Sequence, residues 1–391
     1  MPRTAASHPS SRAAGVGTTV FAEMSALAAA TGAVNLGQGF PDTDGPPEIA
    51  EAAVAAIRAG RNQYAPGPGL PELRAAVAGH QQRFYGMTYD PDGEVLVTTG
   101  ATEAIAAALL GLVDPGDEVV VLEPYYDSYV ACIGFAGGVR RPVTLHPPGY
   151  ALDVDALRRA VTPRTKVLLL NSPHNPTGAV LSLDELTAVA EVAVEHDLVV
   201  VADEVYEHMA FDADRPHVPV ASLPGMRVRT LSIGSAGKTF SFTGWKVGWV
   251  TGPADLIECV RLAKQFLTYV SGAPFQPAIA LGLGLPDSYF FGLRDGLAAK
   301  RDLLCDGLDS VGLDVHRPRG TYFVTTDVRP LGYDDGWTFC RDLPGRAGVV
   351  AIPHAPFWDD VAVGAPLVRW AFCKKDEVLT EAVERLRAAF T

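Results

Sequence analysis

Five short runs of apolar, largely β-branched residues recur through the first two thirds of the chain. They span residues 94–98, 118–122, 166–170, 198–202 and 229–233, and alanine-rich segments of helical spacing separate them. A strand that is apolar at nearly every position must be buried on both faces, as in parallel sheets covered by helices. The pattern therefore predicts an α/β fold built on a mostly parallel sheet.

The pattern changes near residue 286. A helical stretch over 291–311 leads to short strand-like segments, and an amphipathic helix is expected over 376–390. These elements predict a second, smaller α+β domain. The expected organisation is a flexible N-terminal arm, a segment that joins the small domain, a large domain and the small domain, at residues 1–18, 19–46, 47–285 and 286–391.

Composition limits the partners and the compartment. The 391-residue chain has a formal net charge of −13, which argues against nucleic acid or an anionic membrane as a partner. Its five cysteines are scattered and form no C-x-x-C pair, as expected for free thiols in a reducing compartment, and we expect no metal site. No signal peptide is recognisable, and no apolar run approaches the roughly 20 residues of a membrane span. The expectation is a soluble cytoplasmic protein.

Polar residues follow each of the five apolar runs. These segments are residues 99–103, 123–127, 171–178, 203–206 and 234–239. Ligands of parallel α/β sheets bind outside the carboxyl ends of the strands. The hydroxyls, amide, acid, aromatic rings and lysine in these segments therefore predict a site for a polar cofactor.

Lys238 lies in the small-residue stretch Ser-Ile-Gly-Ser-Ala-Gly-Lys-Thr, and Lys246 is expected on the strand just beyond it. An amine among small neighbours, beside hydroxyls and a second cation, suits pyridoxal phosphate, whose aldehyde bonds a lysine. A nucleotide P-loop is a rival interpretation, because residues 237–239 resemble its end, but that motif requires glycine where this chain has Ser232. A solvated surface lysine is the plainest alternative.

A pyridoxal enzyme also needs a buried carboxylate that keeps the ring nitrogen protonated. Asp203, which follows four apolar strand residues, fits this role. Asn175 and Tyr206 can donate hydrogen bonds to the ring oxygen, and Tyr126 can stack on the ring. Each has an ordinary structural alternative: a helix cap for Asp203, a turn at Asn175 and core packing for Tyr126.

Two anion sites are expected. Gly100, Ala101 and Thr102 precede a helix and offer free backbone amides to a phosphate, with Ser235 and Lys246 adding a hydroxyl and a cation. The second site is Arg369, the one charged residue in an apolar run. It suits the α-carboxylate of a substrate, although an internal salt bridge would also explain it.

These motifs occur together and resemble the class I aminotransferases of fold type I, from about residue 19 onward. The matching segments are residues 35–42, 62–64, 100–104, 175–178, 203–206, 235–238 and 244–248. The first is similar to the branch of kynurenine, glutamine and methionine aminotransferases. Longer stretches at 18–27, 272–277 and 329–335 are similar to the N-succinyldiaminopimelate aminotransferases.

The resemblance implies a seven-stranded sheet, pyridoxal 5'-phosphate as cofactor, and transfer of an amino group from an amino acid to a 2-oxo acid in two half-reactions. It implies Lys238 as the catalytic residue and a homodimer in which Tyr64 reaches the neighbouring active site. The implied cofactor-binding residues are Ala101, Thr102, Tyr126, Asn175, Asp203, Tyr206, Ser235, Lys238, Lys246 and Tyr64. The implied substrate-binding residues are Arg369, Gly39, Phe21 and Asn175.

The substrate stays open at this stage, because residues 351–358 depart from the family pattern. Alternatives are a broad-specificity kynurenine, glutamine or methionine aminotransferase, a cysteine-conjugate β-lyase and an enzyme of specialised metabolism. A ligand-sensing regulatory module and a nucleotide-binding ATPase are the alternatives outside this family. For a succinylated substrate with extra carboxylates, His354 is predicted to lie near the distal end.

Overall fold

The computed structural model describes residues 12, 17 and 19–390. The arm predicted over residues 1–18 therefore lies almost entirely outside the described residues.

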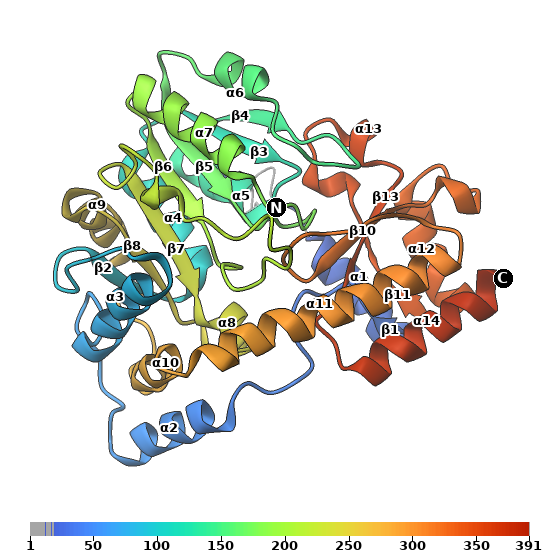
Figure 1. Ribbon diagram of the computed structural model, residues 1–391, viewed down its shortest axis with the longest axis horizontal. Coiled ribbons are helices and arrows are strands. Elements are labelled where there is room, and N and C mark those ends of the chain that lie inside the picture. The colour runs from blue at the N-terminus through green and yellow to red at the C-terminus, as the bar shows by residue number, and fades with distance from the viewer. Residues whose placement is uncertain (1–11, 13–16, 18, 391) are drawn as a thin grey trace, which may run out of the picture.

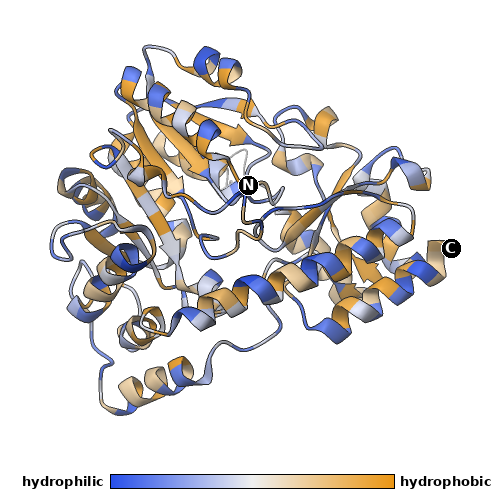
Figure 2. Cartoon of the chain, in the orientation of Figure 1, coloured by the Kyte–Doolittle hydropathy of each residue, from blue (hydrophilic) through white to orange (hydrophobic). Residues whose placement is uncertain are grey.

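A seven-stranded sheet forms the centre of the larger part of the molecule (Figure 1). All five apolar runs become strands in it, and six of the seven strands run parallel, with β8 antiparallel to both of its neighbours. Figure 2 shows these strands as largely hydrophobic. In spatial order the strands are β2 (Val95–Thr98), β8 (Gly248–Thr251), β7 (Thr230–Ser235), β6 (Val199–Asp203), β5 (Thr165–Asn171), β3 (Glu118–Glu123) and β4 (Val139–Thr144). The predicted fold class is confirmed.

Two details differ from the sequence predictions. Strand β4, at the sheet edge, lacks an apolar run because Arg140, Arg141 and Pro142 occupy its exposed or half-exposed positions, which is usual for an edge strand. Lys246 is not on a strand. It adopts the left-handed conformation, with φ of 54°, two residues before β8 begins.

Helices cover both faces of the sheet. Right-handed crossovers place α4 and α5 on one face, where α9 packs against α4, and α6 and α7 on the other. Shorter and peripheral helices complete this part. The helices are α2 (Pro47–Arg58), α3 (Pro71–Tyr85), α4 (Gly100–Leu112), α5 (Asp127–Ala136), α6 (Val154–Ala160), α7 (Leu183–Glu195), α8 (Ala236–Thr239), α9 (Ala254–Lys264) and α10 (Phe275–Leu283).

The C-terminal third forms a smaller α+β unit around a four-stranded antiparallel sheet. Its strands in spatial order are β12 (Ile352–Pro353), β13 (Leu367–Ala371), β10 (Phe323–Asp327) and β9 (Asp314–His316). Its helices are α11 (Asp287–Ser310), α12 (Gly336–Ala347), α13 (Val361–Gly364) and α14 (Asp376–Phe390).

The N-terminal elements belong with this smaller unit. Helix α1 (Val20–Thr31) contacts α12, and β1 (Val34–Asn35) pairs in parallel with β11 (Val349–Val350) (Figure 1). The chain from β1 to α2 therefore crosses from the small unit to the large one. The predicted domain boundaries agree with this division in outline but stay predictions.

No helix within the described residues is long and apolar enough to cross a membrane.

Strands β7 and β8 bring the two lysines of the predicted site together, and their pairing depends on Gly234. This glycine faces Trp249 across the ladder, and a Cβ atom on Gly234 would lie 2.3 Å from Trp249 Nε1. We expect Gly234→Ala to lower the free energy of unfolding by about 1–3 kcal/mol through overpacking. Denaturant unfolding would measure the change.

The matched control is Gly292→Ala in α11, where an added Cβ would meet no atom within 4 Å. That change should leave stability unaltered or raise it slightly, since alanine favours helix. Equal stability of Gly234→Ala and the unmodified protein would contradict the tight contact between β7 and β8.

Candidate active site

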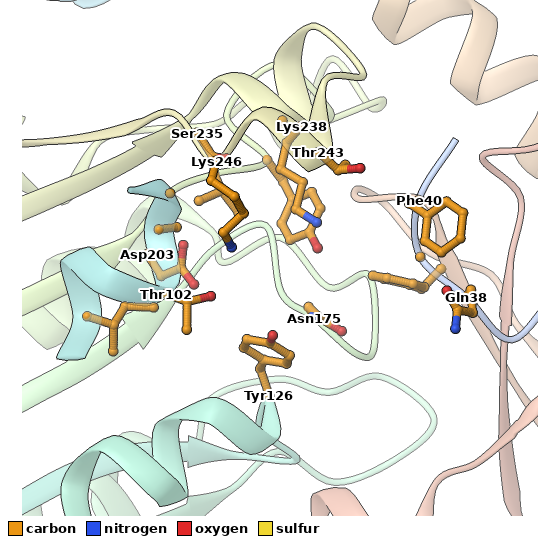
Figure 3. Close-up of a pocket in the computed structure, with 18 of the residues that line it drawn as sticks. Gln38, Phe40, Thr102, Tyr126, Asn175, Asp203, Ser235, Lys238, Thr243 and Lys246 are labelled. Carbon is orange, nitrogen blue, oxygen red and sulfur yellow. The ribbon is translucent and has the colours of Figure 1, made fainter. Parts of the chain in front are cut away.

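A cavity of about 360 Å³ opens at the carboxyl ends of the parallel strands. Strands β3 and β5 are neighbours, yet their connections leave in opposite directions, and ligands bind at such switch points. Tyr126 follows β3 and Asn175 follows β5, so these side chains enter the cavity from the two sides of that point. Figure 3 shows Asp203, Thr102 and Lys246 toward one end of the cavity, and Gln38 and Phe40 toward the other.

The first end of the cavity lies at the start of α4 and offers groups suited to an anion. Gly100 has a φ of +76°, and a Cβ there would lie 3.3 Å from Lys246 Nζ, so the ammonium sits directly beside the helix N-terminus. Ser235 and Thr243 line the same cavity. Free amides at a helix start, hydroxyls and a lysine together favour a phosphate-sized anion.

Asp203 is buried at the end of β6. Its Oδ2 accepts a hydrogen bond of 2.6 Å from the Tyr129 hydroxyl, while Oδ1 is buried without a partner among the described residues. Burial raises the pKa of Asp203 to about 6, although Tyr129 opposes the rise. Asp203 therefore offers one free oxygen in a dry environment, which suits a protonated ring nitrogen.

Lys238 lies on α8, one turn past β7, with its amine in the cavity (Figure 3). Its Nζ donates a hydrogen bond of 3.0 Å to the Tyr322 hydroxyl, which in turn donates to the carbonyl oxygen of Gly39 at 2.7 Å. Burial of the amine, with Arg369 and Lys246 as further contributors, lowers the pKa of Lys238 to about 8. A larger fraction of the amine is thus uncharged near neutral pH than in an exposed lysine, as nucleophilic lysines require.

Arg369 projects from β13 and is almost completely buried. It donates to Asn175 Oδ1 at 3.0 Å and to the Gly37 carbonyl at 3.2 Å, and Phe323 lies under its guanidinium at 4.0 Å. No acidic side chain of the described chain pairs with it, so the internal salt bridge considered from sequence is absent there. Its buried Nε also has no partner in this part of the chain, which leaves donors for a carboxylate.

The cavity gathers almost all the residues singled out from sequence. Within the described residues it is lined by Phe21, Gly39, Ala101, Thr102, Tyr126, Asn175, Asp203, Tyr206, Ser235, Lys238, Lys246 and Arg369. Tyr64 is the exception: 81% of it is exposed and its ring contacts Tyr269. Lysine, acid and arginine thus share one cavity, and a solvated surface lysine is excluded for Lys238.

The profile of the family described as "Aminotransferase class I and II" matches residues 31–386 of this chain. The chain belongs to this family. It is a transaminase, and the P-loop ATPase and regulatory-module alternatives fall away with that assignment.

Comparison with named relatives shows which aminotransferases this chain is similar to. It is 58% identical over 379 residues to the "Probable N-succinyldiaminopimelate aminotransferase DapC" of Mycobacterium tuberculosis, covering 94% of this chain and 95% of the relative. It is 38% identical to the methionine aminotransferase of Escherichia coli, covering 97% and 98% of the two chains. The solved N-succinyldiaminopimelate aminotransferase of Mycobacterium tuberculosis superposes with a TM-score of 0.95 at 57% identity, covering 98% and 100%.

Several side chains in or behind the cavity of the aminotransferase were missed from sequence. Tyr129 and Tyr322 are core aromatics whose hydroxyls happen to reach Asp203 and Lys238, and nothing in their local sequence signals this. Gln38 and Phe40 line the cavity within the segment 35–42 that carried the family resemblance, so that motif could have found them.

The prediction for His354 is wrong. This side chain is fully buried and does not line the cavity. Trp358 Nε1 donates to its Nδ1 at 2.8 Å, and its Nε2 lies 3.2 Å from the Thr325 hydroxyl. His354 therefore supports the segment behind Arg369 and does not reach a substrate.

The raised pKa of Asp203 makes a prediction about stability. In the cofactor-free protein the folded state holds this proton more tightly than the unfolded state, whose carboxyl has a pKa near 3.8. The stabilising contribution is therefore complete below pH 3.8 and is lost as pH rises through about 6. We expect cofactor-free Asp203→Asn, which mimics the protonated acid, to be more stable than the unmodified protein at pH 7 by on the order of 2 kcal/mol.

Thermal unfolding between pH 4 and pH 8 would measure this difference, which should shrink as the pH falls. Asp309→Asn, an exposed change on α11, serves as control and should show no such pH dependence. If Asp203→Asn were less stable than the unmodified protein at pH 7, the conclusion that the ionised Asp203 carboxylate destabilises the cofactor-free fold would be contradicted.

Proposed function

We propose that this aminotransferase binds pyridoxal 5'-phosphate in the cavity around Lys238 and moves an amino group between N-succinyl-LL-diaminopimelate and a 2-oxo acid. The observation that carries the substrate is the 58% identity to the DapC relative across 94% of this chain and 95% of that one. Its role would then be in lysine biosynthesis. The observation that supports the cofactor is the arrangement of unpartnered polar atoms in the cavity.

The residues present fit this cofactor. The start of α4, with Ala101, Thr102, Ser235 and Lys246, would hold its phosphate, which matches the anion site. The free Oδ1 of Asp203 would accept the ring N–H, and Tyr126 would lie on a ring face. Asn175 and Tyr206 would bind the ring oxygen, and Lys238 would bond the aldehyde.

When bound, pyridoxal phosphate supplies an aldehyde that carries the amino group between the half-reactions and a ring that takes up electrons. Lys238 then has two tasks. It would give up the aldehyde to the amino group of the substrate, and its freed Nζ, less basic than an exposed lysine, would take the proton from the substrate Cα. The Tyr322 hydroxyl, 3.0 Å from Nζ, positions the amine for this transfer.

Arg369 would fix the substrate by its α-carboxylate, since its guanidinium has donors to spare and aromatic rings exclude water around it. With its α-carboxylate on Arg369, the substrate would extend its side chain toward the end of the cavity where Gln38 and Phe40 lie. The Gln38 amide nitrogen donates to the Ser25 hydroxyl, and its second N–H would be the donor for the carboxylates of a succinylated side chain. A second candidate function is transamination of a broader range of amino donors. The 38% identity to the methionine aminotransferase of Escherichia coli favours it.

We further propose a homodimer in which Tyr64 of each chain serves the partner's site. A hydrophobic patch, defined here as Tyr64, Phe266, Leu267 and Tyr269, is exposed, with Phe266 86% accessible. Thr268, which lies between Leu267 and Tyr269 in sequence, forms a hydrogen bond with Thr99. Thr99 immediately precedes α4, where the phosphate would bind. A second copy seated on the patch would cover it and bring a Tyr64 hydroxyl toward the phosphate.

A cytoplasmic location and a large domain that ends near residue 285 belong to the same proposal. All five cysteines are free thiols, which agrees with a reducing compartment.

The half-reaction is the direct test of substrate. The purified enzyme would receive N-succinyl-LL-diaminopimelate, methionine, glutamine, kynurenine or a cysteine conjugate, each without a 2-oxo acid, while the visible absorbance of the lysine-bound cofactor is followed. We expect the succinylated substrate alone to discharge the band rapidly. Lys238→Ala should lack that band and lose turnover by at least about 10²–10⁴-fold.

Rapid discharge by methionine, glutamine or kynurenine with none by the succinylated substrate would overturn the lysine-pathway assignment. Pyruvate and ammonia released from the cysteine conjugate, without loss of the band, would indicate a β-lyase. Normal turnover by Lys238→Ala would contradict the cofactor assignment itself.

The shared site predicts complementation between two defective chains. In a hybrid of a Lys238→Ala chain and a Tyr64→Ala chain, one of the two sites combines the intact Lys238 of one chain with the intact Tyr64 of the other. We expect the hybrid, purified through two affinity tags, to be more active at limiting cofactor than either variant homodimer. Activity of the hybrid no higher than the mean of the two homodimers would contradict the exchange of Tyr64.

A further inference from the structure

A cluster of ionisable side chains lies outside the cavity, on the turn that carries two of its residues. Asp203 and Tyr206 line the cavity, whereas Glu207 and His208, which follow them directly, meet His80 of α3. His80 and Glu207 are buried, and none of the three residues lines the cavity. None of these three residues has a role in the proposed transamination.

The geometry brings three potential ligand atoms together. One nitrogen of His80, one nitrogen of His208 and one Glu207 oxygen all lie within 4.8 Å of one another. The two histidines face each other through their Nε2 atoms at 2.8 Å. Two ring nitrogens that point at each other cannot both carry a proton, so at least one presents a lone pair to its neighbour.

The surroundings are those of a ligand site rather than of a simple apolar core. Tyr85 and Gln81, on the same helix as His80, hydrogen-bond the Glu207 carboxyl and so hold it in place. The rings of Phe84 and Phe290 lie 4.8 and 4.5 Å from the His208 ring. Such orienting bonds and apolar walls are what metal-binding carboxylates and imidazoles have around them.

Buried ring nitrogens beside the cluster lack partners. Both nitrogens of His217, whose ring lies 5.6 Å from the Tyr85 ring, and Nδ1 of His80 make no hydrogen bond within the described residues. Buried polar atoms normally have hydrogen-bond partners, so three buried nitrogens without one are unusual for a simple apolar core. They indicate polar groups available to a ligand. This observation is independent of the contact between His80 and His208.

We propose that His80, Glu207 and His208 bind a divalent transition metal, with zinc as the ion that their two imidazoles and one carboxylate suit best. Two nitrogens at about 2.0–2.1 Å from a tetrahedral zinc lie about 3.3 Å apart, so the 2.8 Å contact has to open by only about 0.5 Å. A fourth position remains for water. The ion would be structural: it ties α3 to the turn that presents Asp203 and Tyr206.

The sequence predicted no metal site because its histidines are 128 residues apart and lack a ligand-spaced motif. Only the fold brings α3 against the turn after β6.

The experiment measures metal directly, apart from transamination. Cofactor-loaded enzyme is stripped with a chelator, freed of the chelator and incubated with zinc, and the zinc retained after gel filtration is counted by elemental analysis. Cobalt(II) is added separately to record its visible absorption, which reports tetrahedral nitrogen and oxygen ligands. We expect about one zinc per chain for the unmodified enzyme. His80→Gln and Glu207→Gln should bind zinc at least about 10-fold more weakly.

The matched control is His196→Gln, an exposed histidine at the end of α7, which should bind zinc like the unmodified enzyme. Melting temperatures in metal-free buffer show whether each variant folds, and His208→Gln replaces any that does not. Zinc should raise the melting temperatures of the unmodified enzyme and of His196→Gln, and should leave those of the cluster variants unchanged. Absence of saturable zinc, or equal binding by the cluster variants and the control, would overturn the proposal and leave a hydrogen-bonded histidine pair.

Discussion

Asp203 and Arg369 are buried in one cavity, and the half-buried Lys238 lies with them, yet within the described chain none of the three forms an ion pair. Burial without pairing disfavours the charged forms, which is why the pKa of Asp203 is raised and those of Lys238 and Arg369 are lowered. Each charged group would be better solvated in water than in this cavity. The rest of the fold must therefore hold all three in place. A ligand with a phosphate, a ring nitrogen and a carboxylate would satisfy them together.

The fold holds them through hydrogen bonds from hydroxyl and amide groups in and behind the cavity wall. Tyr129 orients Asp203, Tyr322 orients Lys238, and Asn175 joins Arg369 to the end of β5. Each of these contacts joins segments far apart in sequence. The segment between Asp203 and His208 is held from two sides, by the cavity residues and by the contact with α3. Order at the cofactor end of the site thus depends on packing outside it.

The sheet, the strand ends and nearly all the cavity residues could be predicted, because buried parallel strands leave a continuous apolar signal and ligand groups follow their ends. Strand β4 could not, since an edge strand with Arg140 and Arg141 carries no such signal. Tyr129 and Tyr322 could not, because their roles arise from contacts across 74 and 84 residues of sequence. His354 looked like a substrate ligand only because sequence does not reveal that Trp358 and Thr325 already engage it.

The two walls of the cavity come from different parts of the chain. Residues after β2, β6 and β7 form the wall that contains Asp203 and Lys238. The opposite wall contains Gln38, Phe40, Phe323 and Arg369, which come from the N-terminal segment and the small C-terminal sheet. Mutations that reshape the second wall leave the first intact. A lineage with this architecture can therefore exchange one amino acid substrate for another by drift in its terminal segments, while the chemistry that all its members share stays under separate selection in the central sheet.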